Sequence, residues 1–520
     1  MTGLAAVLFL VALATAVATG ARHWRIPAPS LLVVAGVAVG VLPWMPDVRV
    51  EPEVISVLVL PPLLYASAEE ISWRDLREVW RPVTVLVFGL VLASAAVVCT
   101  VAALTTPLTG SMAFVLGAVL ASTDPVAVTA LGRRLALPPR VQVMVQAESL
   151  FNDATSLVLF KVAVGSAVIS GAVSPPGAVG KFVVLGGGGA LVGAAVAGMV
   201  VLIRKRTEDP VLEAVIALVT PYAAYVLAED LKTSGVTAVV LAGVLLGSTG
   251  HKLASAPIRL QVHAVYATVV FLLENVVFAL IGLELPSLVR ALAPDERGWP
   301  LGVLAVAATV IAVRVLWIFP LSAVMQHRRG EGRISWRIPA VASWAGTRGV
   351  MPLAAALSIP LVTSGGESLP HRSLVLTLTT GVVALTLVVQ GFTLAPLVRR
   401  SGIALEPEHT AREEARARCS LAHAALLHLD KLIDLEAVPT AVADQLRRDL
   451  ENRLGVEGEA GVDDTAGLRF AIADHRAMRR TLIGVESEEL LRLYETHEIS
   501  DTTRRRIQRS LDLEELGLTD

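Results

Sequence analysis

Long apolar segments alternate with short polar breaks through the first 400 residues of the chain. Most of these segments have the length, about 20 residues, that a helix needs to cross the hydrocarbon core of a bilayer. Their spacing predicts thirteen transmembrane helices, with one boundary left open between residues 262 and 298. The predicted helices cover residues 2–20, 29–46, 53–69, 82–105, 110–131, 141–170, 179–203, 210–229, 234–249, 262–285, 299–326, 338–361 and 372–398.

Lysine and arginine are distributed unevenly over the breaks, and this asymmetry predicts the orientation of the chain. Because basic loops stay on the cytoplasmic side, we expect the N-terminus outside, the C-terminus in the cytoplasm and an odd number of spans. The first apolar segment lacks the basic region that opens a secretory signal, so it is expected to remain as the first span. The basic breaks all follow odd-numbered segments and hold Arg22 and Arg25; Arg74, Arg77 and Arg81; Arg133, Arg134 and Arg140; Arg204, Lys205 and Arg206; Lys252 and Arg259; and Arg328, Arg329, Arg333 and Arg337.

Composition predicts an all-α, polytopic membrane protein that ends in a soluble region. Of the 520 residues, 54% are hydrophobic and 17% are charged, which is too apolar for a soluble globular protein. Residues 1–400 form the predicted transmembrane domain, with a net charge of +7. Residues 401–520, with 25 acidic and 16 basic residues, form a predicted cytosolic domain of net charge −9.

Apolar residues at helical spacing predict several amphipathic helices in this cytosolic domain. A solvated helical appendage is the simplest interpretation, and a regulatory or dimer-stabilising role is the alternative. The predicted helices cover residues 411–435, 438–454, 465–483 and 486–498.

Several chemistries lack their sequence signatures. The two cysteines, Cys99 and Cys419, imply no disulfide framework, and the ten histidines do not reach the spacing of zinc ligands. The chain carries no motif that makes a case for nucleotide binding or hydrolysis. We therefore expect no enzymatic activity, no cofactor and no nucleic-acid partner, and we expect the lipid bilayer to surround residues 1–400.

The sixth apolar segment, 141–170, carries a stripe of polar residues. Groups of this kind are costly where they face lipid, so the stripe is expected to face the protein interior or water and to serve a function. Lys161 points away from the stripe and lies roughly 12 Å further outward at about 1.5 Å per residue, which favours a packing or snorkelling lysine. At about 100° per residue, the stripe falls within about 140° of arc and comprises Glu148, Ser149, Asn152, Asp153 and Ser156.

The fifth apolar segment is interrupted at mid-membrane depth by Ser122-Thr123-Asp124-Pro125. Pro125 lacks an amide hydrogen and disfavours a helical conformation at Asp124, so the helix is expected to break there. The freed carbonyls, the Thr123 hydroxyl and the Asp124 carboxylate are oxygen donors suited to a small hard cation. The alternative is that Asp124 merely caps the half-helix that follows the break.

The two acidic segments resemble a known family. The strings ASTDPVAV at 121–128 and ESLFNDATSLVLF at 148–160 are similar to the paired signature helices of the monovalent cation/proton antiporters of the sodium/proton exchanger type. The resemblance extends in order over residues 1–400, whereas 401–520 carry none. Supporting strings are LPPLLYA at 60–66, ENVVFALIGLEL at 274–285, AGTRGVMPLA at 345–354 and VVQGFTLAPLV at 388–398.

The resemblance implies a core domain and a dimerisation domain built from inverted repeats, and hence a homodimer with elevator-like alternating access. The predicted topology agrees, because spans 5 and 6 run opposite to spans 12 and 13. The location of the second broken helix stays open, since residues 346–349 with Pro352 and residues 377–381 would both serve.

The resemblance also assigns residues to the ion site. Asp153 is implied as the carboxylate that binds the cation and exchanges the proton, beside Asn152. Thr123, Asp124 and Ser149 are implied to complete or stabilise the coordination of the cation.

Other charged residues are implied as scaffold. Glu148 is expected to form a structural ion pair with Arg348, with Arg314 as the second candidate, because removing one member of a buried pair strands the other charge. Glu274 either lines the ion site or makes a hydrogen bond between packed helices.

The expected function is secondary-active exchange of Na⁺ for H⁺ across the cell membrane, with K⁺ and Li⁺ as alternative cations. Proton and cation exclude each other at Asp153, because a bound cation favours the charged carboxylate. Asn152 stands where a second aspartate would carry a second proton, so we expect one proton per cation and no net charge movement. A cation channel or a transport-inactive sensor would share this fold, whereas an intramembrane aspartyl protease would need motifs that are missing.

Overall fold

The predicted spans become helices because a backbone in lipid can satisfy its own hydrogen bonds within a helix. Among the residues that the structure describes, all regular elements are helical, apart from an isolated β-bridge between Val362 and Ser368. The structure is a computed structural model that describes residues 3–24, 27–42, 55–124, 139–168, 175–207, 209–253, 255–328, 335–363, 367–402, 407–434, 440–453 and 468–517.

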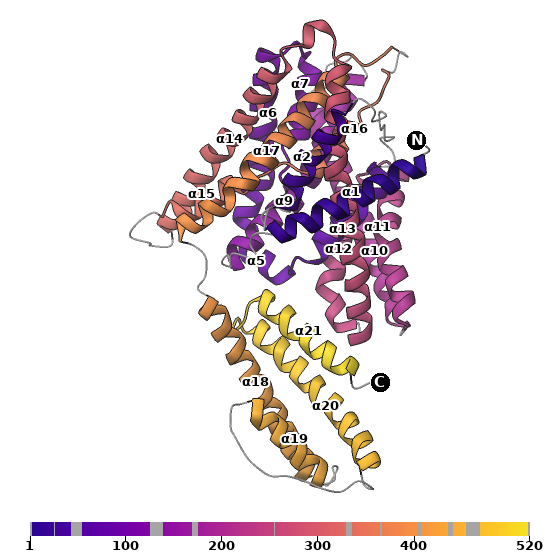
Figure 1. Cartoon of the computed structure of the whole chain (residues 1–520), viewed down its shortest axis with the longest axis vertical. Coiled ribbons are helices and arrows are strands. Elements are labelled where there is room, and N and C mark those ends of the chain that lie inside the picture. Colours follow the sequence, from indigo (N-terminus) through magenta and orange to yellow (C-terminus); the bar gives the residue numbers. More distant parts are fainter. Residues whose placement is uncertain are drawn as a thin grey trace. The chain divides into compact units, whose positions relative to one another are not determined.

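The chain divides into two compact units (Figure 1). The first unit contains Met1–Thr207, Leu212–Leu253 and Ala264–Ala404, and the second contains Glu208–Val211, Ala254–His263 and Leu405–Asp520. The two short segments near 208 and 254 thus cluster with the C-terminal residues, although sequence alone assigns them to the membrane domain.

Each predicted span has a helical counterpart in the structure. Within the described residues, seven helices are long and apolar enough to cross a membrane, and shorter apolar helices account for most of the other spans. The open boundary near 262–298 is resolved, because one helix, α13, runs without a break to Arg290 and is followed by the short 3₁₀ helix η3 (Pro294–Glu296). The helices are α1 (Gly3–Trp24), α2 (Ala28–Gly40), η1 (Ile55–Val59) with α4 (Leu60–Glu69), α5 (Trp73–Thr84) with η2 (Val85–Leu90) and α6 (Val91–Thr105), α7 (Gly110–Leu120), α9 (Pro139–Val168), α10 (Pro175–Arg204), α11 (Pro210–Asp230), α12 (Gly235–Leu253), α13 (Ala256–Arg290), α14 (Trp299–Arg328), α15 (Arg337–Trp344) with α16 (Val350–Leu357), and α17 (Arg372–Ser401).

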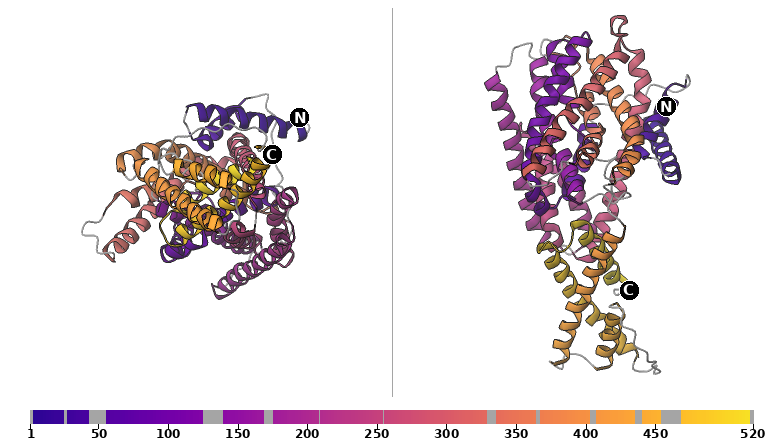
Figure 2. Two further views of the ribbon diagram at one scale, coloured as in Figure 1. Left: turned by 90° about the horizontal axis from the view of Figure 1, so that it is seen from below. Right: turned by 90° about the vertical axis from the view of Figure 1, so that its left-hand side faces the viewer.

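Small residues set the closest helix contacts of the first unit, whose helices run side by side in Figure 2. A methyl group added to Gly36 of α2 would overlap the carbonyl oxygen of Ala279 on α13. Gly193 of α10 lies equally close to the backbone of Ala238 on α12. Such contacts bring backbones together where lipid supplies no hydrophobic drive between helices, and the resulting van der Waals packing holds the bundle.

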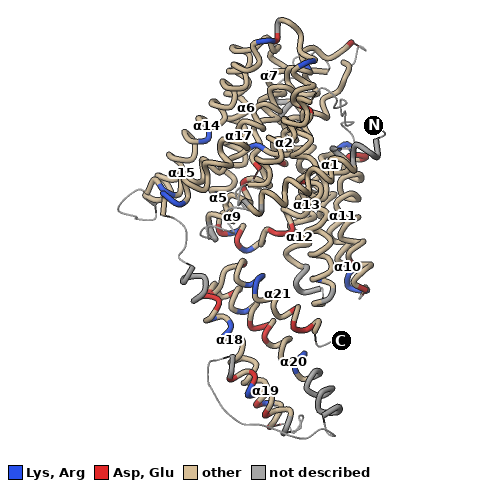
Figure 3. Tube along the Cα trace, in the orientation of Figure 1, with Lys and Arg blue, Asp and Glu red and all other residues tan. Residues whose placement is uncertain are grey.

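The second unit is built from helices in which charged residues alternate with apolar ones, and Figure 3 marks the charged positions along the trace. Its helices are α18 (Pro407–Asp434), α19 (Thr440–Arg453), α20 (Leu468–Glu495) and α21 (Asp501–Gly517). The sequence pattern predicts two helices where α20 is continuous, and it misses α21. Apolar side chains from α18, α20 and α21 form one cluster, and Arg479 is buried against Glu486 and Glu514.

Candidate functional site

The end of one helix meets an interrupted helix inside the first unit. Helix α7 ends at Leu120, and the backbone of Ser122, Thr123 and Asp124 is non-helical. Helices α15 and α16 are likewise separated by residues 345–349. The Asp124 amide donates to the Thr347 carbonyl at 2.8 Å, and the Thr347 hydroxyl donates to the Asp124 carbonyl at 2.9 Å. Each break therefore satisfies backbone groups of the other.

These contacts decide where the second broken helix lies. The break lies at residues 345–349, so it includes the first candidate segment, 346–349. The second candidate, residues 377–381, lies inside the continuous helix α17. Pro125, which is expected to cause the first break, lies outside the described residues.

Opposite charges stand at the two half-helix ends. Asp124 Oδ2 accepts a hydrogen bond from the Val350 amide at 3.1 Å, in the first turn of α16. Arg348 Nε donates to the carbonyl of Leu120, the last residue of α7, at 2.8 Å. A carboxylate at a helix N-terminus and a guanidinium at a C-terminus both complement the helix dipole. Asp124 thus caps α16, whereas the half-helix expected to follow Asp124 in sequence lies outside the described residues.

Gly349 makes the approach of the Asp124 carboxylate possible. A Cβ atom at this position would overlap the carboxylate of Asp124. Only glycine leaves that volume empty, so the residue before α16 is fixed by the carboxylate that caps the helix.

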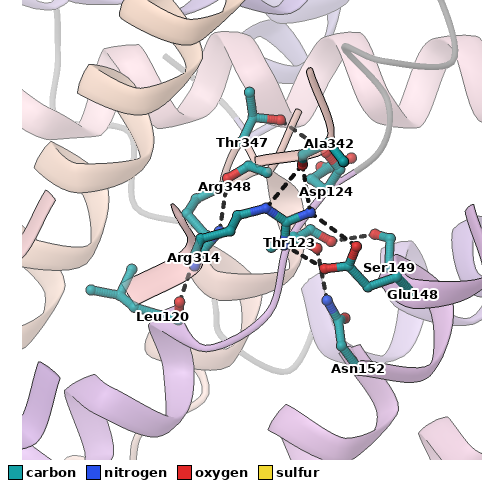
Figure 4. A network of polar contacts seen from close by, with 11 residues as sticks. Leu120, Thr123, Asp124, Glu148, Ser149, Asn152, Arg314, Ala342, Thr347 and Arg348 are labelled. Atoms are coloured by element: carbon teal, nitrogen blue, oxygen red, sulfur yellow. Dashed lines mark hydrogen bonds and ion pairs between the residues drawn. The ribbon is translucent and has the colours of Figure 1, made fainter. Parts of the chain in front are cut away.

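The polar stripe of α9 holds the first break in place (Figure 4). Ser149 donates to the Thr123 carbonyl, and Asn152 Nδ2 donates to the Thr123 hydroxyl oxygen at 2.7 Å. Ser156 donates to the Ala118 carbonyl at 2.6 Å, two residues before the end of α7. All three side chains are buried, so the stripe faces the protein interior.

Asp153 lies in this buried region and keeps an oxygen atom unoccupied by protein groups. Its side chain is 6% exposed, and its Oδ1 has no hydrogen-bond partner among the described residues. The Oδ1 atom of the neighbouring Asn152 also lacks a partner there. Two unpaired oxygen acceptors on adjacent residues are unusual in a protein interior.

Glu148 pairs with Arg314, so the expected pairing with Arg348 is wrong. Arg314 Nη2 donates to Glu148 Oε2 at 2.9 Å, and Nη1 contacts Glu148 Oε1, which makes a bidentate ion pair (Figure 4). Arg314 also donates to the Ala342 carbonyl on α15. The spacing of α9 places Glu148 one turn before Asn152 but does not reveal which arginine faces it.

Three further polar residues complete the account. Glu274 on α13 is half-buried, and its expected role stays a prediction. Lys161 forms an ion pair with Glu229, so it is more than a snorkelling lysine. Thr347, which sequence reasoning did not assign a role, bonds directly to Asp124. Its position in the AGTRG string is the signal that could have identified it.

The fold and the site define a polytopic membrane protein in which the end of α7 meets the interruption between α15 and α16, with a buried carboxylate nearby. Residues 7–400 match the family described as sodium/hydrogen exchanger, transmembrane. The chain belongs to this family.

Individual relatives agree with this assignment. The chain is 34% identical over 528 residues to an uncharacterized Na⁺/H⁺ exchanger of Mycobacterium tuberculosis strain H37Rv, which covers 98% of this chain and 96% of the relative. It is 30% identical over 478 residues to the Na⁺/H⁺ antiporter ApNhaP of Aphanothece halophytica, covering 90% and 86%. The solved structure of the sodium proton antiporter MjNhaP1 from Methanocaldococcus jannaschii at pH 8 shares the fold, with a TM-score of 0.64 at 21% identity and coverage of 77% and 98%.

Proposed function

We propose that this chain is a secondary-active antiporter that exchanges Na⁺ for H⁺ across the cell membrane. Membership of the sodium/hydrogen exchanger family supports the reaction class. The observation that carries the site assignment is the buried Asp153 carboxylate, whose Oδ1 has no hydrogen-bond partner among the described residues. Oδ1 of this carboxylate is therefore available to bind a proton or a cation.

The proposed cation ligands are oxygen atoms around Asp153. Asp153 Oδ1 and Asn152 Oδ1 have no hydrogen-bond partner among the described residues, and the Thr123 hydroxyl is held next to Asn152 by the hydrogen bond from Nδ2. Carboxylate, amide and hydroxyl oxygens are the donors that a hard cation takes in place of water. Ser149 and Asp124 support this set: Ser149 fixes the Thr123 carbonyl, and Asp124 fixes the break from which Thr123 projects.

Exchange follows from competition for Asp153. A proton neutralises the carboxylate, whereas a cation binds its charged form, so one occupant displaces the other. If the helices that carry the site change their access only when Asp153 is occupied, each turnover exchanges one cation for one proton. The inward proton gradient then drives Na⁺ out of the cytoplasm.

One proton per cation is the proposed stoichiometry. Asn152 cannot ionise, and Asp124 is engaged at the first turn of α16, where the helix dipole favours a negative charge. Asp153 is therefore the carboxylate of this crossing that exchanges protons. The transport cycle then moves no net charge.

The arrangement in the membrane completes the proposal. The basic breaks place the N-terminus outside and the C-terminus in the cytoplasm. A homodimer joined through a dimerisation domain, against which the core domain moves, is the proposed assembly.

A vesicle assay tests the function. Purified protein in sealed vesicles with an imposed pH gradient should dissipate the gradient on addition of Na⁺. K⁺ and Li⁺, added separately, then define the cation selectivity. Na⁺ flux without any counter-movement of protons would indicate a channel, and no flux with any of the three cations would indicate a transport-inactive sensor.

A further inference from the structure

Buried polar atoms without a protein partner gather on α17 and α15, next to the second broken helix. Gln390 on α17 is 0% exposed, and neither its Nε2 nor its Oε1 has a hydrogen-bond partner among the described residues. The same holds for the hydroxyls of Thr379 and Thr380 on α17 and of Ser343 on α15. Protein interiors rarely leave buried polar atoms unpaired, so each of these groups indicates a polar neighbour that is not protein.

A hydrogen bond places this set beside the crossing of the two breaks. The Arg348 amide donates to the Thr386 hydroxyl oxygen at 3.4 Å and so joins residues 345–349 to α17. Gln390 lies four residues beyond Thr386, about 6 Å along the helix. At about 100° per residue, Thr379, Thr386 and Gln390 fall within about 40° of arc. The unpaired groups of Thr379 and Gln390 therefore lie on the face of α17 that meets Arg348, on either side of the contact.

Neighbouring threonines show that the unpaired hydroxyls are not an ordinary feature of this helix. The hydroxyls of Thr377 and Thr386 each donate to a carbonyl one turn earlier, at 2.9 Å. This local bond is the usual way in which threonine is satisfied inside an apolar helix. Thr379 and Thr380 lack it, so their hydroxyls stay available to another group.

Apolar packing closes the side of Gln390 that lies toward the C-terminal end of α17. Leu394, one turn further along α17, belongs to a buried cluster with Val145 of α9 and Val341 and Ala345 of α15. A polar molecule beside Gln390 is therefore shielded by this cluster. Such enclosure is typical of internal water, which pairs with buried polar groups that would otherwise be unsatisfied.

The chemistry of the set selects water over a cation. A glutamine side chain presents two N–H donors as well as a carbonyl acceptor, and each hydroxyl both donates and accepts. Water matches both roles. A dehydrated cation takes acceptors alone and favours a carboxylate, which Asp153 supplies on α9 and this set of side chains does not.

We propose that Gln390 anchors an internal water site that supports the second broken helix. Water bound there satisfies the Gln390 amide and neighbouring polar groups, and it stabilises the junction that Thr386 and Arg348 form. The site stands on the geometry of α17 and does not depend on which ion is transported.

Whether substitution of Gln390 lowers or raises the Tm tests this proposal. Gln390→Met keeps the approximate volume and removes every hydrogen-bonding group, so loss of the water's anchor should lower the Tm of the full-length protein in detergent. Gln390→Asn keeps an amide and should restore part of the loss. Leu394→Met, one turn away in the apolar cluster, is the matched control and should stay near the wild-type Tm, because Leu and Met exchange easily in cores.

The opposite result has a clear physical meaning. If the amide is simply unpaired, Gln390→Met removes buried unsatisfied groups and the Tm rises. A rise would overturn the proposal. So would a cryo-EM map that resolves water elsewhere in the core but shows no density within hydrogen-bonding distance of Gln390. Both readouts are independent of transport, so they hold whether or not the antiport assignment does.

Discussion

Two carboxylates lie five residues apart on α9 and have opposite surroundings. Both oxygens of Glu148 are bound by Arg314, in an ion pair whose members are almost fully buried. Asp153 is similarly buried but keeps Oδ1 without a partner among the described residues. Burial alone does not distinguish the structural carboxylate from the proposed ion-binding carboxylate on this helix. The hydrogen-bond partner distinguishes them, because a carboxylate that neutralises a buried arginine cannot leave it without leaving the arginine unpaired.

Asp124 is intermediate between the two. Its carboxylate accepts from the Val350 amide, and its backbone forms two hydrogen bonds with Thr347. The charge is matched by the end of a helix instead of by a side chain. A carboxylate in this role fixes the geometry of the crossing. Its charge affects Asp153 only through space, by electrostatic repulsion.

The largest effect is expected at Asp153. Asp153→Asn should abolish Na⁺-dependent proton flux in vesicles, because an amide cannot exchange a proton at working pH. The variant should still elute as a folded protein with a Tm near that of the wild type, since Oδ1 has no hydrogen-bond partner among the described residues. Normal exchange in this variant would contradict the proposal that Asp153, unlike Glu148, binds the transported ions.

Glu148 should behave in the opposite way, with its main effect on stability. Glu148→Gln or Arg314→Met alone should cost about 3–5 kcal/mol, because each leaves a buried charge unpaired. The two changes together should cost less than their sum. Thermal unfolding of the four proteins in this cycle measures the coupling.

Arg348 supplies the control for that cycle. It donates to the Leu120 and Gly346 carbonyls and not to Glu148. Combining Glu148→Gln with Arg348→Met should therefore give losses closer to additive. Strong coupling to Arg348, with none to Arg314, would contradict the pairing described above.

Substitution of Gly349 should reduce exchange more than substitution of a glycine that has open space around its Cα atom. Gly349→Ala places a methyl group where the Asp124 carboxylate lies, so the cap of α16 should be displaced and exchange should fall by about tenfold, as for a loss of roughly 1.4 kcal/mol. Gly198→Ala, in α10 with nothing near its added Cβ, is the matched control and should retain normal exchange. Equal exchange rates in the two variants would show that the cap is not needed.

A smaller effect on transport is expected from the second unit. Arg479 is buried between Glu486 and Glu514 and resembles Arg314 in this respect. Arg479→Met should destabilise the second unit, which limited proteolysis would detect. Exchange in vesicles should persist, because none of the proposed ligands lies in that unit. Complete loss of exchange in a folded first unit would mean that the second unit takes part in the cycle.

No effect is expected from the membrane potential. An electroneutral exchanger moves no net charge, and the potential acts on moved charge at about 2.3 kcal/mol per charge per 100 mV. After K⁺ transport by the protein has been excluded, a K⁺-diffusion potential should neither drive nor accelerate Na⁺ uptake. Potential-driven uptake would raise the proton count above one and place Asp124 among the groups that release protons.

Hydropathy predicts the helices of this chain well because each span must satisfy its own backbone in lipid. The polar stripe of α9 is predicted for a similar reason, since Ser149, Asn152 and Ser156 have to face inward. Sequence does not reveal which arginine meets Glu148, because that choice depends on how α14 and α15 pack against α9. The capping of α16 by Asp124 is hidden for the same reason: it joins residues more than two hundred positions apart.

Proton release on sodium binding tests most directly whether one carboxylate serves both ions. Sodium is mixed with purified protein in weakly buffered detergent solution, and a pH-sensitive dye records the protons released. The wild type should release one proton for each sodium ion bound, Gly198→Ala should match it, and Asp153→Asn should release none. Undiminished release from Asp153→Asn would show that sodium displaces the proton from another group and would contradict the assignment of Asp153.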